Sequence, residues 1–236
     1  MNILILSCSY GVPDYTLGNP ERATTTSNIE YYLSKHHTVF NLSTNGSSNW
    51  QAIQRAHEFI DGNEVEHIPC GQDAYTTIQK PADINIDYVI WIGTSLLRDQ
   101  HIIHVPTLDQ CIAELQDITY NEMKKLMQKI PTAKLIAVGG CGPIDETALR
   151  NVLPVHYCIP DWRAELLGME YTEHLSGGAK LNLNDLITDP RLSKHLSMAQ
   201  TVYTNMHGSD AFPDSSHPGG IAHKGLYEKI LPHISI

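Results

Sequence analysis

The segment that most constrains the fold is residues 87–93, which read DYVIWIG. It is a continuous apolar run of strand length, the pattern of a strand that is buried on both faces of a sheet. Such a strand belongs in the centre of a parallel sheet with helices above and below it. We therefore predict an α/β fold with this segment as a central strand.

The rest of the chain alternates between apolar runs of strand length and segments with helical periodicity. Parallel neighbouring strands need crossover connections, so this alternation predicts a three-layer α/β/α sandwich with a mainly parallel, flavodoxin-like central sheet. No internal repeat or low-complexity linker divides the sequence, and we expect residues 1–236 to form a single domain. The other expected strands are residues 2–8, 37–42, 134–138 and 152–157, and the expected helices are residues 21–35, 50–60, 120–130, 162–167, 184–187, 191–203 and 225–231.

Composition and charge exclude several classes of protein. A net charge of −10 has the wrong sign for a protein that neutralises phosphates, so nucleic acid is not an expected partner. No apolar run approaches the ~20 residues that span a bilayer, so no membrane span is expected. The opening MNILIL lacks the basic start of a signal peptide and is interpreted as a strand, which favours a cytoplasmic or a phage- or virus-associated protein.

Nucleotide and cysteine motifs are absent as well. The sequence has neither G-x-G-x-x-G nor G-x-x-x-x-G-K-[ST], which removes the main support for a nucleotide cofactor. The five cysteines are scattered without a C-x-x-C pair, so we interpret most of them as buried thiols. Cys8 is a nucleophile in principle, but strand alternation points it away from Ser9 and into the interior.

Four loops carry the residues that suggest chemistry, and all are expected at the carboxyl edge of the sheet, where sites form in such folds. Ser9 follows the first strand, where a sharp turn can expose a nucleophilic hydroxyl. Gly46 lies in the second loop, and glycine lets a backbone N–H approach a ligand closely. Near the other terminus, Asp214 precedes His217 by three residues, so the carboxylate can orient the imidazole as a general base.

These blocks, with Gly93-Thr94-Ser95 on the third loop, resemble the SGNH hydrolases, also called GDSL esterases and lipases. The resemblance follows the order of the blocks along the whole chain. It implies an SGNH-type domain that hydrolyses an O-acyl ester, such as a small acyl group on a carbohydrate. By the same resemblance Ser9 is the nucleophile, His217 the base and Asp214 its partner, and the oxyanion is held by Ser9, Gly46 and Ser95, with no cofactor or metal.

The chain departs from the family in two places. Ser7 and Cys8 stand where the family has Gly-Asp before the serine, a change that removes no triad member. The third block lacks the asparagine of Gly-x-Asn-Asp, which leaves a hydroxyl of Thr94 or Ser95 as the substitute donor. Loss of an oxyanion donor costs ~100-fold to 1,000-fold in rate, so a catalytically weakened SGNH-fold binding or structural module is the alternative function.

Other polar residues allow further interpretations. A metal-dependent hydrolase would need about three ligands, whereas the histidine pairs 36/37 and 101/104 have no acidic or cysteine partner at a recognised spacing. Arg98 is interpreted as an exposed structural arginine, with binding of an anionic substrate as the alternative. The expected partner is a small-molecule or carbohydrate ester. The sequence does not predict the oligomeric state.

Overall fold

A computed structural model describes residues 1–8, 11, 28–44, 47–67, 76–103, 107–140, 142–162 and 220–234, except the side chains of residues 67, 97, 100, 101, 108, 109 and 220–222. In this part of the chain the main sheet has five parallel strands in the order β2-β1-β5-β6-β7. This is the flavodoxin-like strand order, as predicted. The strands are β1 (Asn2–Ser7), β2 (Thr38–Asn41), β5 (Tyr88–Gly93), β6 (Lys134–Gly139) and β7 (Tyr157–Ile159).

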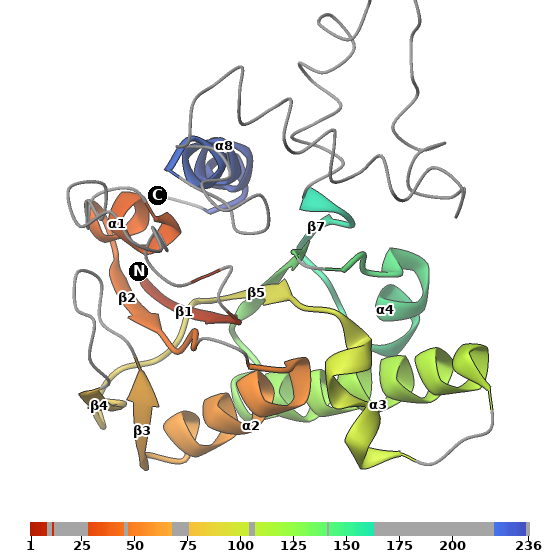
Figure 1. The fold of residues 1–236 in the computed structure, drawn as a ribbon. Coiled ribbons are helices and arrows are strands. Elements are labelled where there is room, and N and C mark those ends of the chain that lie inside the picture. The colour runs from red at the N-terminus through yellow and green to blue at the C-terminus, as the bar shows by residue number, and fades with distance from the viewer. Residues whose placement is uncertain are drawn as a thin grey trace, which may run out of the picture.

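Strand β5 occupies the centre of the sheet, as its apolar sequence predicts. It pairs with β1 on one side and β6 on the other, with Ile90 opposite both Ile5 and Ile136. All six of its residues are buried. The strand has no solvent-facing side because helices cover both faces of the sheet (Figure 1).

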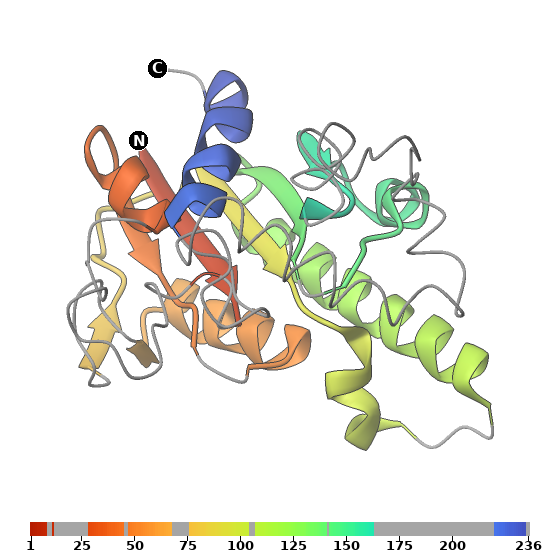
Figure 2. The same cartoon turned by 45° about the horizontal axis from the view of Figure 1, so that its top comes forward.

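Alternate side chains of each strand enter two separate cores, one on each face of the sheet. Leu4 and Leu6 of β1 join the core under α2 (Asn49–Ile60), α3 (Leu108–Lys129) and α4 (Glu146–Val152). Ile3 and Ile5 join the core under α1 (Ile29–Ser34) and α8 (Gly220–Ile230). Figures 1 and 2 show α1 and α8 on one side of the sheet and α2 and α3 on the other, which gives the three predicted layers.

Capping side chains set where the helices begin. Ser48 caps α2 in a reciprocal capping box with Gln51. Helix α3 starts well before the predicted residue 120, because the Thr107 side chain accepts a hydrogen bond from Gln110 N and no glycine or proline interrupts the chain up to residue 129. Helix α8 also begins earlier than predicted and contains Gly225, where we expected the helix to start.

The structure corrects the sequence prediction at two other elements. Residues 152–157 were predicted as a strand, but Val152 ends α4, whose N-terminus is capped by Asp145, and β7 begins only at Tyr157. A hairpin of β3 (Glu64–His67) and β4 (Thr76–Gln79) was not predicted, since its short polar strands lack an apolar run. The predicted helices at 162–167, 184–187 and 191–203 lie almost wholly outside the described residues. No helix in the described ranges is both long and apolar enough to cross a membrane.

Candidate active site

Gly11 of the first loop lies beside the end of β1. Gly11 N donates to Cys8 O at 3.1 Å, and Ser9 falls between these two residues, outside the described part of the chain. A Cβ on Gly11 would overlap Ser43 Oγ and lie 2.7 Å from Ser7 Cβ, so only glycine allows the first loop to pack against the second. Cys8 is 1% exposed and packs into the core under α1 and α8, as predicted for a structural thiol.

The second loop is fastened to the first by backbone hydrogen bonds. Thr44 N donates to Ser7 O at 3.3 Å, and Ser47 N donates back to Thr44 O at 3.3 Å. Gly46 lies between Thr44 and Ser47 in sequence and outside the described residues. Both described flanks of the predicted oxyanion glycine are therefore held at the end of β1.

Asn41, the last residue of β2, joins these two loops and α1 through its side-chain amide. Its Nδ2 donates to Gly11 O and to Glu30 Oε2, both at 2.9 Å, while its Oδ1 accepts from Ser43 N at 3.0 Å. Asn41 is 3% exposed. The donor and the acceptor of one buried amide thus fix the relative positions of both loops and the helix.

The third loop is held by a second buried asparagine, Asn49, in the first turn of α2. Asn49 Nδ2 donates to Thr94 O at 2.9 Å, and its Oδ1 accepts from Thr94 N at 2.8 Å. Ser95, the predicted oxyanion donor, follows directly at the carboxyl end of β5 and is half-buried. The loop after β6 packs against it, since a Cβ on Gly142 would lie 3.3 Å from Ser95 Cα.

Two arginines hold the far side of the second loop. Arg55 Nη2 donates to Ser47 Oγ at 2.6 Å, and Arg98 Nη1 donates to Ser47 O at 3.3 Å. Arg98 is exposed, and this contact gives it the structural role that the sequence analysis favoured. The next residue, Asp99, is 1% exposed and accepts a hydrogen bond from Trp50 N at 3.2 Å.

The fourth block, with Asp214 and His217, lies outside the described residues, but the helix that follows it is described. Helix α8 runs antiparallel to the strands. Near its start the His223 ring lies 5.4 Å from that of Trp162, which comes after β7, and beyond its end His233 O lies 2.9 Å from Nε2 of His156, which precedes β7. The first turn of α8 therefore faces the carboxyl edge of the sheet, where the other three loops meet.

Several buried polar groups gather near this edge. The hydroxyls of Ser7, Ser43 and Thr94 have no hydrogen-bond partner among the described residues, nor does either ring nitrogen of His223. Burial lowers the pKa of His223 to about 3, so the ring is neutral at pH 7. Burial also raises the pKa of Glu30, although its hydrogen bonds with Asn41 and Asn28 oppose that shift.

Gly11, Asn41 and Asn49 are positioning residues that the sequence analysis missed. A weak signal existed in the sequence, since Asn41 is a polar residue next to the end of the predicted strand 37–42 and Asn49 directly precedes the predicted helix 50–60. Neither position reveals its partner, because the bonds cross from one loop to another. For the metal alternative, the described residues contain no group of three or more His, Cys, Asp or Glu side chains that could hold an ion. His104 and the His101 side chain lie outside the described part.

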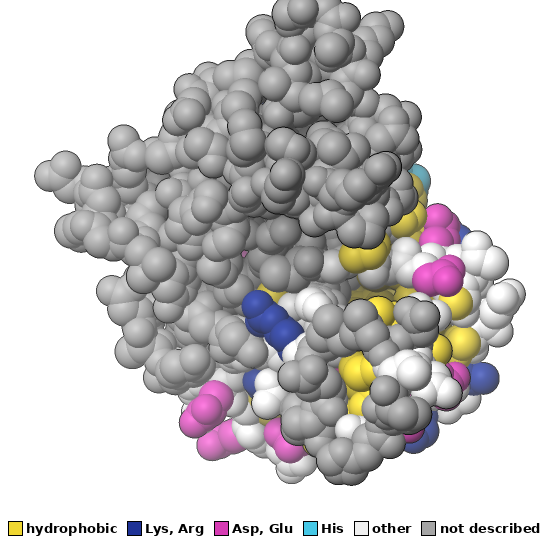
Figure 3. Space-filling model, turned by 45° about the vertical axis from the view of Figure 1, so that its right-hand side comes forward, with side chains coloured by type: hydrophobic (Ala, Val, Ile, Leu, Met, Phe, Trp, Pro, Cys, Tyr) yellow, Lys and Arg dark blue, Asp and Glu magenta, His cyan; other side chains and the backbone are white. Residues whose placement is uncertain are grey.

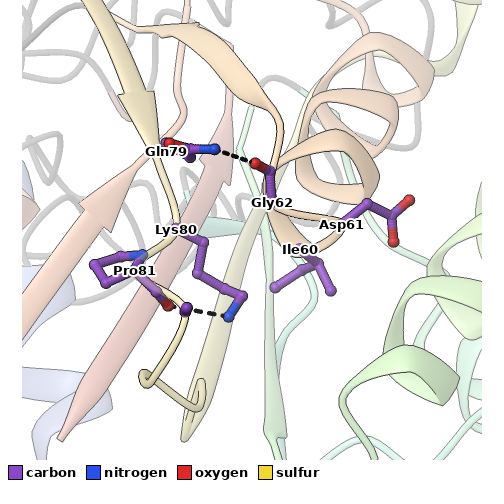
Figure 4. A pocket seen from close by; sticks show the side chains of 7 residues that line it. Ile60, Asp61, Gly62, Gln79, Lys80 and Pro81 are labelled. Carbon is purple, nitrogen blue, oxygen red and sulfur yellow. Dashed lines mark hydrogen bonds between the residues drawn. The ribbon is translucent and has the colours of Figure 1, made fainter.

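A cavity of about 440 Å³ lies at the other end of α2, lined by Ile60, Asp61, Gly62, Gln79, Lys80, Pro81 and Ala82 (Figure 4). Its polar side chains already bond to the protein: Gln79 donates to Gly62 O, and Lys80 Nζ donates to the carbonyls of Pro81 and Ile84. The twelve residues of α2 place this cavity about 18 Å from the start of the helix. It is separate from the candidate active site.

Comparison with known proteins gives structural similarity without sequence similarity. No family model matches the chain, and no curated protein sequence matches it. A structure of the psychrotrophic esterase EstA from Pseudoalteromonas sp., inhibited by monoethylphosphonate, aligns with 98% of this chain and 95% of its own at 14% identity and a TM-score of 0.44. The acetyl xylan esterase Est2A from the rumen bacterium Butyrivibrio proteoclasticus aligns with 99% of this chain and 65% of its own at 13% identity and a TM-score of 0.40.

Structural similarity at TM-scores below 0.5 does not establish a shared function. On the face shown in Figure 3, the charged side chains of the described residues form no large patch of one sign. Acidic and basic side chains are scattered there among polar and hydrophobic ones.

Proposed function

We propose that the protein is a serine ester hydrolase of the SGNH type that acts at the carboxyl edge of the parallel sheet. Ser9 Oγ attacks the acyl carbon while His217 takes its proton, with Asp214 orienting the imidazole. The bond from the acyl carbon to the alcohol oxygen then breaks, and His217 returns the proton to the leaving alcohol. Water repeats the two proton transfers on the acyl-enzyme and releases the acid, so the reaction needs no metal or cofactor.

The observation that supports this proposal most is that the described residues next to all four sequence blocks lie toward the same edge of the sheet. Asn41 joins the loops after β1 and β2, and Asn49 joins the third loop to the start of α2. His217 precedes Gly220, the first residue of α8, by three residues, a chain length that spans at most about 11 Å. A base on that segment is therefore tied closely to α8, whose first turn faces the carboxyl edge of the sheet, and this supports the proposed triad.

The strand register also supports the pairing of the nucleophile with the third loop. Ser7 of β1 is paired with Ile92 of β5, so Ser9 and Thr94 each stand two residues beyond a paired position. The Thr94 hydroxyl is buried, in a residue that is 5% exposed. We therefore assign the substitute oxyanion donor to the half-buried Ser95, beside the backbone amides of Ser9 and Gly46.

The proposed substrate is a small O-acyl ester, with a carbohydrate as the alcohol. The first test is hydrolysis of p-nitrophenyl acetate by the parent and by Ser9→Ala, His217→Ala and Asp214→Asn variants. We expect a loss of at least about 1,000-fold for Ser9→Ala and His217→Ala. Ser34→Ala, an exposed serine at the end of α1, is the matched control and should keep full activity.

The competing functions predict other results. A binding or structural module with the same fold would show no turnover in the parent protein. A metal-dependent hydrolase would lose its activity to a strong chelator and keep it in Ser9→Ala. Either result would reject the serine hydrolase proposal.

A further inference from the structure

A second cavity, of about 560 Å³, opens beside the second loop, at the end of α2 that faces the candidate active site. Thr44 and Ser47, the described flanks of Gly46, form one side of it. The other side is a stripe of α2 formed by Trp50, Gln51, Gln54, Arg55 and Glu58. Small-ligand sites fall in this range of volume. A molecule bound here would lie next to the predicted oxyanion loop.

The cavity continues along α2 toward β3. A neighbouring cavity of about 410 Å³ shares Thr44, Arg55 and Glu58 with the first and adds Glu64, Val65 and Glu66. We call the two cavities together the α2 groove. The groove leads away from the proposed reacting centre. The alcohol part of an ester would extend in this direction if it is larger than the acyl group.

The side chains of the α2 groove favour a neutral polyhydroxylated ligand. Three carboxylates against one guanidinium disfavour an anionic ligand. The only aliphatic side chain of the lining, Val65, is 3% exposed and offers little surface to an alkyl chain. Amide, carboxylate and guanidinium groups donate and accept hydrogen bonds in the mixture that sugar hydroxyls require.

The two glutamines have one amide atom committed and one left over. Gln51 Oε1 accepts from Ser48 N at 3.0 Å, and Gln54 Nε2 donates to Glu122 Oε2 at 3.2 Å. Gln51 Nε2 and Gln54 Oε1 have no partner among the described residues. Each glutamine is thus held in place by one bond and keeps a donor or an acceptor for a ligand.

Trp50 supplies the aromatic surface of the α2 groove. Of the three tryptophans, Trp91 and Trp162 are 1% exposed, whereas Trp50 is half-buried. The bond from its backbone N to the buried Asp99 fixes its position. An indole ring stacks on the apolar C–H face of a sugar ring and offers an N–H to a hydroxyl.

We infer that the α2 groove is the subsite for the alcohol part of the ester and that it binds a neutral carbohydrate, with Trp50 as the stacking residue. This inference rests on the proposed ester hydrolase. It assigns acyl chemistry to the edge of the sheet and recognition of the leaving group to α2. Substrate preference should therefore depend on residues that have no part in proton transfer.

The test compares 6-O-acetylglucose, whose leaving alcohol is glucose and would fill the groove, with ethyl acetate, whose leaving alcohol does not reach it. For Trp50→Ala we expect KM for 6-O-acetylglucose to rise about threefold to tenfold, the range for one lost aromatic contact, with kcat changed less than twofold. Ethyl acetate kinetics should stay unchanged. Gln54→Ala provides a second variant with an expected effect in the same direction. Asp61→Ala, in the cavity at the other end of α2, is the control and should leave KM and kcat unchanged for both substrates.

Failure of the subsite and failure of the function give different results. If Ser9→Ala abolishes turnover of both esters but Trp50→Ala leaves both KM values unchanged, the subsite is wrong and the hydrolase proposal stands. A parent enzyme that prefers hexyl acetate to 6-O-acetylglucose would also overturn the subsite. Binding of cellobiose, followed by fluorescence of the half-buried Trp50 with Trp50→Phe as reference, tests the groove without catalysis. No change in fluorescence at millimolar cellobiose would count against the inference.

Discussion

Replacing Asn49 should separate the third loop from α2 and lower both stability and activity. Its amide makes two hydrogen bonds to the backbone of Thr94, at 2.8 and 2.9 Å, and the residue is 2% exposed. Asn49→Ala leaves a buried N–H and a buried C=O without their partner, and each such group costs about 1–3 kcal/mol. Asn49→Asp keeps the acceptor for Thr94 N but directs an oxygen at Thr94 O. We expect the free energy of unfolding to fall by about 2–6 kcal/mol in Asn49→Ala.

Urea unfolding measures this loss, which should appear as a lower midpoint at an unchanged m value. Each kcal/mol should also lower Tm by roughly 2–4 °C in a chain of this size. Asn121→Ala is the matched control, because the half-buried Asn121 on α3 makes only solvent-exposed hydrogen bonds, to Asp117 one turn away, so its change should stay within about 0.5 kcal/mol. If both Asn49 variants are as stable as Asn121→Ala, the bonds to Thr94 do not hold the third loop and the reasoning is wrong.

Three further variants test other parts of the site. Gly11→Ala places a Cβ in contact with Ser43 Oγ, and we expect a loss of about 1–3 kcal/mol in urea unfolding together with a large fall in kcat/KM; parent-like values of both would contradict the close packing. Burial raises the pKa of Glu30 above 4.5, so native Glu30 binds more protons than the unfolded chain and stability falls as pH rises. Glu30→Gln keeps an acceptor for Asn41, and its free energy of unfolding should increase relative to that of the parent as pH rises from 4.5 to 7.5. A difference between variant and parent that does not change with pH would refute this. The pKa of His223 is lowered from 6.5 to about 3, so the free energy of unfolding of the parent falls as pH falls from 6.5 to 3. In His223→Phe the free energy of unfolding should depend less on pH over this range. The same pH dependence in the variant and the parent would contradict the prediction.

The sequence predicts most of the sheet because its strands are apolar and buried on both faces. Residues 87–93 could not be confused with a surface strand, and the crossover rule then leads to a parallel sheet. The hairpin of β3 and β4 escaped prediction because each strand has four residues of which only one, Val65 or Ile78, is apolar. Helix α3 was predicted too short, although apolar residues such as Leu108, Cys111 and Leu115 continue its helical spacing toward the N-terminus, which the Thr107 cap marks.

The candidate site was predictable only as separate blocks. Ser9, Gly46, Asp214 and His217 come from short motifs in a recognisable order, and their placement remains a prediction because they lie outside the described residues. Asn41 and Asn49 could not be found from the sequence. An asparagine that bonds to another loop has no local signature, and its partner is set by which strands become neighbours in the sheet.

The most direct test of the central claim is active-site labelling with a fluorophosphonate, followed by mass spectrometry of the modified peptide. A fluorophosphonate reacts with a serine only where a base activates the hydroxyl and an oxyanion site accepts the charge. We predict one adduct per chain, on Ser9, that disappears in Ser9→Ala and is strongly slowed in His217→Ala. An unlabelled parent protein, or an adduct that persists in Ser9→Ala, would contradict the account.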